Sequence, residues 1–162
     1  MNPRTTTIEE KILVGMHVRM SVADAKLHEL WPKFMPRRNE AKNRIEKSNF
    51  YSVQIHDGLF NPQAYTPKTE FERWAAVAVA DKSSLPEGME FLIIPAGKYA
   101  IFEYKGLPQN FAPFWEKIYL EWLPTSDYLL DERPYFELLE DGYNPNDPEA
   151  EEEIWVPITA KS

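Results

Sequence analysis

The sequence contains no cysteine, which excludes disulfide bonds and thiolate chemistry. Histidine is scarce too, and the three that are present, His17, His28 and His56, have no metal-ligand spacing between them. The chain also lacks a glycine-rich phosphate loop, the nucleophile elbow of hydrolases and the zinc-binding helix of metalloproteases. We therefore expect neither a metal ion nor another cofactor.

Positive charge is in deficit, with 18 Lys and Arg residues against 26 Asp and Glu residues and a net charge of −8. Nucleic-acid binding depends on clustered basic side chains, so we expect no direct nucleic-acid partner. The one short basic cluster, Arg37 and Arg38 with Lys42 and Arg44 after it, is typical of a solvated helix face.

Long hydrophobic runs are absent as well. The longest, residues 74–80, is far too short to cross a bilayer, and the chain does not open with an apolar signal segment. We expect a cytoplasmic protein with no membrane partner. At 162 residues, of which 43% are hydrophobic and 14% aromatic, the chain is long enough to form one domain, residues 1–162, around its own core.

Two segments of the chain repeat each other. The sequence DGLFNP at 57–62 returns as DGYNP at 141–145, with an offset of 84 residues at the Asp-Gly pair. Aromatic residues outside the loop are matched as well: Trp31 with Trp115 and Tyr51 with Tyr135 at the same offset of 84, and Trp74 with Trp155 at 81. Length changes confined to a loop are typical of structural duplication. We therefore predict two pseudo-repeats, about residues 8–81 and 90–160.

Each predicted repeat reads strand, helix, strand, strand, according to the period of its apolar residues. The first contains strand 12–20, helix 24–45 and strands 50–56 and 71–79, with Pro32 and Pro36 able to bend or split the helix. The second contains strand 98–105, helix 108–123 and strands 135–140 and 152–158, and a short strand at 89–94 joins the two.

This pattern predicts an α+β fold. Two duplicated βαββ units would form one antiparallel sheet, with the two main helices on one face and a pseudo-two-fold axis between the units. The crevice between the helices is then the expected ligand site.

Glu137 breaks the pattern of its own strand. In the first repeat Tyr51, Val53 and Ile55 share a face, and the offset of 84 matches Val53 with Glu137. A carboxylate at a core-facing position is costly unless it is paired or faces a cavity. Two alternatives stay open. The second strand reverses its phase, because Phe136 and Leu138 are also apolar, or Glu137 pairs with an internal Arg73.

A carboxylate in an aromatic cavity attracts lipophilic cations through charge pairing and cation–π contact. Aromatic residues on the neighbouring predicted elements could form such a cavity, although ordinary core packing is the alternative for each of them. The predicted ligand-binding residues are Glu137, Trp155, Tyr135, Tyr104, Phe102, Tyr51, Trp115 and Trp31, with Phe111 and Phe114 as further wall candidates. The acidic run Asp147, Glu149, Glu151, Glu152 and Glu153 is typical of a solvated loop.

Several ordered motifs resemble the GyrI-like, or gyrase-inhibitor-like, small-molecule-binding family. They are Ile94-Pro95-Ala96-Gly97-Lys98, Trp122-Leu123-Pro124, Pro134-Tyr135-Phe136-Glu137 and Val156-Pro157-Ile158. The same module serves as the effector-binding domain of AraC-type and MerR-type bacterial transcription activators. The resemblance covers about residues 8–158 and implies a duplicated βαββ fold with a central pocket. It also implies that Glu137 binds cationic or amphipathic aromatic compounds. Leu139 departs from the family's pattern, which often has an aromatic residue there.

The leading hypothesis is a stand-alone binder that senses or sequesters lipophilic, cationic or aromatic small molecules. Residues outside 8–158 are too few for a DNA-binding domain, so a regulatory role would need a partner. A hydrolase of small reactive electrophiles is the alternative, with Glu137 as the catalytic carboxylate beside Tyr104 or Tyr135. A protein-interaction role, such as topoisomerase inhibition, is the third, and a protein partner or a homodimer stays open.

Overall fold

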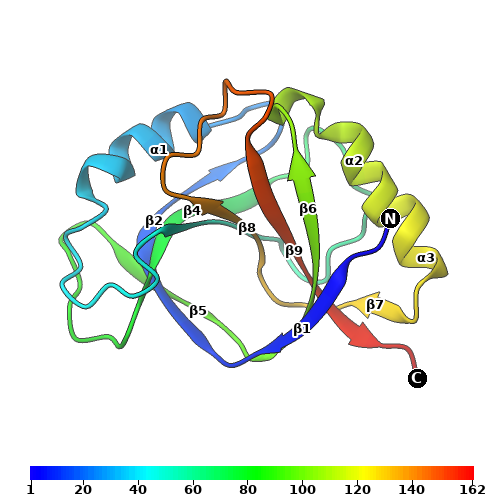
Figure 1. The fold of residues 1–162 in the computed structure, drawn as a ribbon, viewed down its shortest axis with the longest axis horizontal. Helices are drawn as coiled ribbons and strands as arrows, with labels where there is room; N and C mark the ends of the chain where they lie inside the picture. Colours follow the sequence, from blue (N-terminus) through cyan, green and yellow to red (C-terminus); the bar gives the residue numbers. More distant parts are fainter.

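The computed structural model describes residues 1–162 and contains one antiparallel sheet of nine strands (Figure 1). The sheet order is β1-β6-β9-β8-β3-β4-β2-β5, and β7 pairs with β9 beside this path. The strands are β1 Arg4–Ile8, β2 Lys11–Met20, β3 Asn49–Ile55, β4 Phe71–Val79, β5 Glu90–Ile94, β6 Gly97–Lys105, β7 Tyr128–Leu130, β8 Tyr135–Glu140 and β9 Glu151–Ala160. The predicted α+β class with one antiparallel sheet is confirmed.

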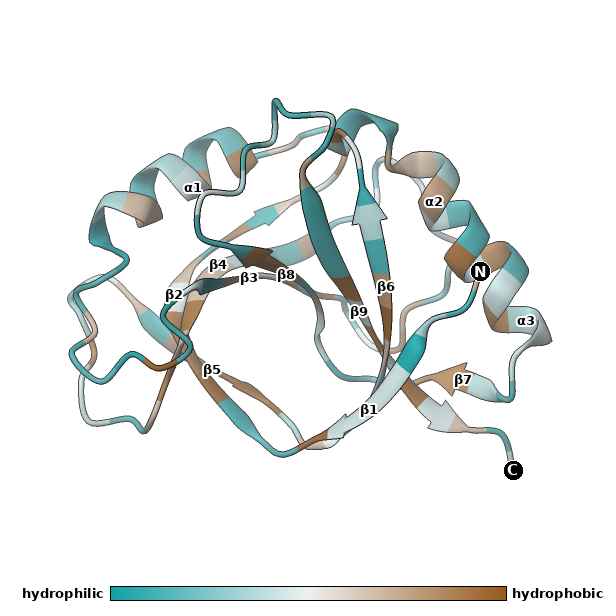
Figure 2. Cartoon of the chain, in the orientation of Figure 1, coloured by the Kyte–Doolittle hydropathy of each residue, from teal (hydrophilic) through white to brown (hydrophobic).

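The helices cover one face of this sheet (Figure 1). One core cluster lies under helix α1, Leu27–Phe34, and a second lies under helix α2, Ala112–Glu116, and the helical turns that follow it. A third cluster occupies the opposite face and includes Tyr51, Val53 and Phe136. Figure 2 shows hydrophobic stretches along the strands, whereas the loop between β8 and β9 is mostly hydrophilic. No helix has the length and apolar character that crossing a membrane would require.

Both halves of the chain carry their elements in the same order. The first runs β2, α1, β3, β4 and the second runs β6, α2, β8, β9, with β7 inserted before β8. Outward from the central β3–β8 pair, the sheet continues through β4 and β2 on one side and through β9 and β6 on the other. The duplication and its two-fold symmetry stay predictions.

The offset of 84 residues does not hold across the central strands. Tyr51 pairs with Leu138 and Tyr135 pairs with Gln54, and cross-strand partners share a sheet face. Because side chains alternate along a strand, Tyr51 and Tyr135 point to opposite faces. The alternative of a phase reversal in the second repeat is therefore confirmed, and matching Glu137 with Val53 was wrong.

The predicted helices are longer or more regular than the observed ones. Helix α1 stops at Phe34 and continues only as a 3-10 turn, Met35–Arg37. Farther along, the Ile45 amide donates to the Ala78 carbonyl and the Ala80 amide donates to the Asn43 carbonyl, so this stretch pairs with the end of β4. Tertiary pairing therefore overrides the helical period that predicted a helix over 24–45.

The second helical region is broken into short pieces. A 3-10 turn at Pro108–Asn110 precedes α2, and a π-helical segment, Lys117–Trp122, leads into the single turn α3, Leu123–Thr125. π-Helical turns occur mostly as local insertions in α-helices and are frequent at functional sites. The π-helical segment turns Ile118 and Tyr119 toward the sheet.

A close approach of β2 and β4 explains the glycine at position 15. A Cβ atom added to Gly15 would lie 2.0 Å from the Ala75 carbonyl oxygen, whereas one added to Gly58 in the β3–β4 loop meets nothing within 4 Å. We expect Gly15→Ala to lower the free energy of unfolding by about 3 kcal/mol because the strands must move apart. Gly58→Ala should cost about 1 kcal/mol through its left-handed backbone alone. Urea denaturation measures both, and equal losses would contradict the close approach.

Candidate functional site

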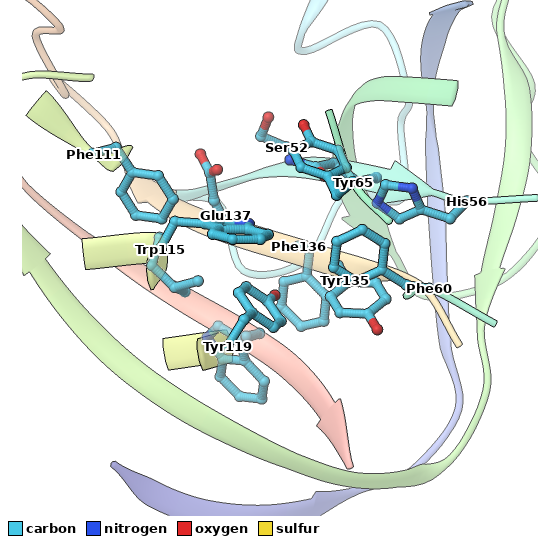
Figure 3. Close-up of a pocket in the computed structure, with 13 residues that line it drawn as sticks. Ser52, His56, Phe60, Tyr65, Phe111, Trp115, Tyr119, Tyr135, Phe136 and Glu137 are labelled. Carbon is cyan, nitrogen blue, oxygen red and sulfur yellow. The ribbon is translucent and has the colours of Figure 1, made fainter. Parts of the chain in front are cut away.

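A narrow cavity lies between α2 and the sheet, on the helix-covered face (Figure 3). Its volume is about 40 Å³. The wall comes from β3, the β3–β4 loop, α2 with the π-helical segment, β8 and β9. It consists of Ser52, Gln54, His56, Phe60, Tyr65, Phe111, Trp115, Tyr119, Tyr135, Phe136, Glu137, Ile154 and Trp155. Nine of these thirteen are hydrophobic, so the cavity has a small polar part in an aromatic surround.

The polar part is built by the β3–β8 register. Glu137 lies directly across from Ser52, and the side chain of Glu137 is 20% exposed. Arg73 on β4 approaches both. Its Nη2 lies 3.6 Å from Glu137 Oε1, and its Nε donates a 3.0 Å hydrogen bond to Ser52 Oγ. The predicted alternative of an internal Arg73 partner is thus confirmed, yet a hollow lies beside the carboxylate.

A second carboxylate stands close by. Glu152 on β9 is half-buried, and its pKa is raised to about 8 by burial and by the charge of Glu137, against the opposing effect of Arg73. The prediction of a solvated acidic run is wrong for this residue. Glu151 and Glu149, in contrast, are exposed as predicted.

The aromatic wall is packed against itself. Phe60 stacks on His56 with ring centroids 4.4 Å apart, and Tyr65 stacks on Trp115 at 5.4 Å. Phe60 also meets Tyr135 edge to face at 5.4 Å. In Figure 3 the Glu137 carboxylate and the Phe111 ring lie at one end of the cavity, and His56 and Phe60 lie at the other. Burial lowers the pKa of His56 to about 4, so its imidazole is neutral at pH 7.

Four of the predicted ligand-binding residues line this cavity. They are Glu137, Tyr135, Trp115 and Trp155. Trp155 lines it only in part. It is the cross-strand partner of Phe136 on β8, and the two rings stack with centroids 5.0 Å apart on the sheet face away from the helices. Phe111, a further wall candidate, also lines the cavity.

The structure places the other four predicted residues elsewhere. Trp31 packs under α1 against Phe34 and Phe50, and Tyr51 lies on the opposite sheet face, where its hydroxyl donates to Glu46. Two others belong to the core under α2 without reaching the cavity wall: Phe102, which packs on Trp122, and Tyr104, whose hydroxyl donates a 2.6 Å hydrogen bond to the Leu107 carbonyl. That bond occupies one of the two tyrosine hydroxyls that the hydrolase alternative would use, the other being that of Tyr135.

Several wall residues were not predicted. Ser52, Gln54 and His56 are the polar residues of the alternation that runs along β3 and one residue past its end, a pattern that the sequence shows but that is typical of a solvent-facing side of a strand. Phe60 belongs to the repeated DGLFNP loop, and only the fold shows that this loop reaches under α2. Tyr65 and Tyr119 carried no sequence signal beyond being aromatic.

Sequence and structure comparisons place the chain among small-molecule-binding domains. The family described as GyrI-like small molecule binding domain matches residues 1–159. The transcriptional regulator BrlR of Pseudomonas aeruginosa is 27% identical over 147 residues, which are 90% of this chain and 51% of BrlR. A DNA gyrase inhibitor of Erwinia billingiae is 34% identical over 103 residues, which are 61% of this chain and 64% of the inhibitor. The chain thus spans only about half to two thirds of these curated relatives.

Solved structures share the fold at low sequence identity. The structure of SAV2435 bound to tetraphenylphosphonium superposes with a TM-score of 0.73 and 15% identity, and covers 98% of this chain and 94% of SAV2435. At this identity the likeness concerns the fold. Since the family match extends over nearly the whole sequence, the chain belongs to the GyrI-like small-molecule-binding family.

Proposed function

We propose that this chain binds lipophilic cations that carry aromatic rings, in the cavity under α2, with Glu137 as the anionic group of the site. The observation that carries this proposal is the Glu137 carboxylate on an aromatic cavity wall. A cation there meets both a negative charge and the faces of aromatic rings, which is the recognised combination for such ligands. Tetraphenylphosphonium in SAV2435, which has the same fold, supports the ligand class.

Pairing with Arg73 does not remove this attraction. The contact between Arg73 and Glu137 is 3.6 Å long, beyond a strong charge-assisted hydrogen bond, and the Nε of Arg73 is committed to Ser52. The cavity-facing side of Glu137 therefore keeps unshared acceptor capacity. Arg73 is not among the residues that line the cavity, so a cation in the cavity would not have to displace the guanidinium to reach Glu137.

Binding requires the cavity to open. A volume of about 40 Å³ holds little more than one or two water molecules, whereas ligand sites typically measure about 300–1,000 Å³. Three wall residues, His56, Phe60 and Tyr65, lie on the β3–β4 loop, which has no regular secondary structure between Ile55 and Phe71, and Phe60 and Tyr65 are farthest along it from β3. We propose that these two side chains leave the cavity when a ligand enters, because a loop moves at lower cost than a paired strand.

Ligand binding by this domain would serve sensing or sequestration. We propose that residues 1–162 form a single effector-binding domain made of two pseudo-repeats, which senses or sequesters its ligand. The relationship to BrlR, a transcriptional regulator, supports sensing as the use of binding. The relationship to the gyrase inhibitor of Erwinia billingiae supports a second candidate, binding to a topoisomerase, which pull-down of purified gyrase at raised salt would test.

Replacing the carboxylate tests the proposed function. We expect Glu137→Gln to weaken tetraphenylphosphonium binding by about 2 kcal/mol, or roughly 30-fold, because the cation loses its counter-charge. Binding of neutral triphenylphosphine oxide should not change. Calorimetric titration measures both, and Glu140→Gln on the same strand, where the side chain is exposed, is the matched control. Equal losses for the charged and the neutral ligand would contradict a role for the charge.

Removing the Phe60 ring tests whether the cavity must open for a ligand to bind. We expect Phe60→Ala to lower the free energy of unfolding by about 3 kcal/mol and to raise the affinity for tetraphenylphosphonium, because the ligand no longer has to displace this ring. Phe102→Ala is the matched control, since Phe102 is 2% exposed in the same core cluster but does not line the cavity. It should lose stability without a change in affinity. Weaker binding by Phe60→Ala would instead make Phe60 a wall that contacts the ligand.

A further inference from the structure

The sheet register brings Glu152 to the same side of the sheet as Glu137. Ile154 on β9 pairs directly with Glu137 on β8, and Glu152 lies two residues before Ile154, so its side chain projects from the same face. The two carboxylates therefore occupy neighbouring strands at diagonal positions, a spacing over which long side chains interact. Both lie on paired strands of the sheet, Glu137 opposite Ser52 of β3 and Glu152 opposite Tyr104 of β6.

Two charged side chains and two tyrosine hydroxyls face Glu152. Glu137 approaches it from β8, Arg73 from β4, Tyr143 from the β8–β9 loop and Tyr104 from β6, where it is the register partner of Glu152. Arg73 is the cation that acts on both carboxylates. With both acids ionised, this group carries two negative charges against one positive charge.

Burial and the negative charge of Glu137 oppose the ionisation of Glu152 and raise its pKa to about 8. At neutral pH the Glu152 carboxyl is therefore mostly protonated, and Glu137 and Arg73 balance each other. Above pH 9 the second carboxylate is ionised, and the group carries a net charge of −1. A cation placed beside Glu137 favours that ionised state.

One polar group of the cavity wall has no hydrogen-bond partner. Tyr135 is 7% exposed, lines the cavity, and its hydroxyl makes no hydrogen bond within the chain. A buried hydroxyl without a partner is costly. This observation is independent of the two carboxylates.

We propose that Glu152 is a second cation-selecting carboxylate of this site, which carries a proton while the cavity is empty and releases it to solvent when a lipophilic cation binds beside Glu137. The inference rests on the proposed function and adds a coupling between ligand and proton. By linkage, a cation that expels a proton binds more tightly as pH rises. The preference of the site for a cation over a neutral ligand then increases as a larger fraction of Glu152 is ionised.

Tetraphenylphosphonium chloride is the probe, because its charge does not depend on pH. At constant ionic strength we expect its affinity to rise about tenfold between pH 6 and pH 9, which corresponds to a shift of about one pKa unit in Glu152. Titration calorimetry at pH 7.5 in phosphate and in Tris, whose heats of ionisation differ, should report the release of a fraction of a proton per ligand bound.

Glu152→Gln should bind the probe with an affinity that no longer changes with pH and with no proton release. Glu151→Gln makes the same substitution at an exposed neighbour on β9 and should keep the wild-type pH profile. Triphenylphosphine oxide, which is neutral, should bind the wild type equally at both pH values.

The stability of the ligand-free protein gives a second readout. A carboxyl group whose folded pKa exceeds its unfolded pKa of 4.5 makes folding less favourable as pH rises through the interval up to about 8. Between pH 5 and pH 8 the melting temperature of the wild type should therefore fall relative to that of Glu152→Gln. A constant difference would overturn the proposed protonation.

The outcomes separate the two proposals. Tight binding of tetraphenylphosphonium with the same affinity at pH 6 and pH 9, and no proton release, would overturn the role of Glu152 and leave the proposed function standing. No binding of the cation at any pH, with correctly folded protein, would overturn both.

Discussion

The antiparallel pairing of β3 with β8 decides which side chains reach the cavity. With Ser52 opposite Glu137, the carboxylate, the serine and Arg73 meet on the helix-covered face. A slip by one residue would turn Glu137 to the opposite face, among Tyr51, Val53 and the rest of a tightly packed apolar cluster. The apolar residues of the two central strands fix the register, and the register in turn fixes the polar site.

That site carries a charge balance which an apolar core would not tolerate. The guanidinium of Arg73, with a side chain only 8% exposed, would be costly without a carboxylate, and two ionised carboxylates would be costly with only one guanidinium. A proton on Glu152 balances the charges while the cavity is empty. A bound cation can take the place of this proton in the charge balance. It cannot take the place of Arg73, whose guanidinium is hydrogen-bonded to Ser52. Charge neutrality of the empty site and affinity for a cation are therefore compatible.

The sequence predicts the strands well because alternation is a local property. The bounds of β4 and β8 agree with prediction residue by residue, whereas the helix predicted over 24–45 fails because residues 43–45 pair with the end of β4, a contact the local period cannot contain. The edge strands β1 and β7 were missed, being short and weakly alternating.

The candidate site is predicted less completely, for a similar reason. Glu137 was identified through its motif and through an offset that the register corrects. Glu152 reads as solvated within an acidic run, since the groups that act on it, Glu137, Arg73 and Tyr143, lie on other elements that only the fold brings together. Phe60 could be recognised as part of a repeated loop, but not as the ring that fills the cavity.

The small volume of the cavity has a consequence for the selectivity among ligands. In the structure the aromatic rings contact one another: Phe60 with His56 and Tyr135, and Tyr65 with Trp115. A ligand with aromatic rings that displaces Phe60 and Tyr65 replaces these contacts with similar ones, so the gain from stacking is small after the loss is subtracted. Apolar area alone therefore gives little preference for one aromatic compound over another. The charge of the ligand has no such counterpart in the empty cavity, because no side chain there offers a cation to Glu137 from the cavity side. The net gain from ring stacking is therefore small, whereas the gain from the ligand's charge is not offset. We expect the site to accept rings of many shapes and to select strictly for positive charge.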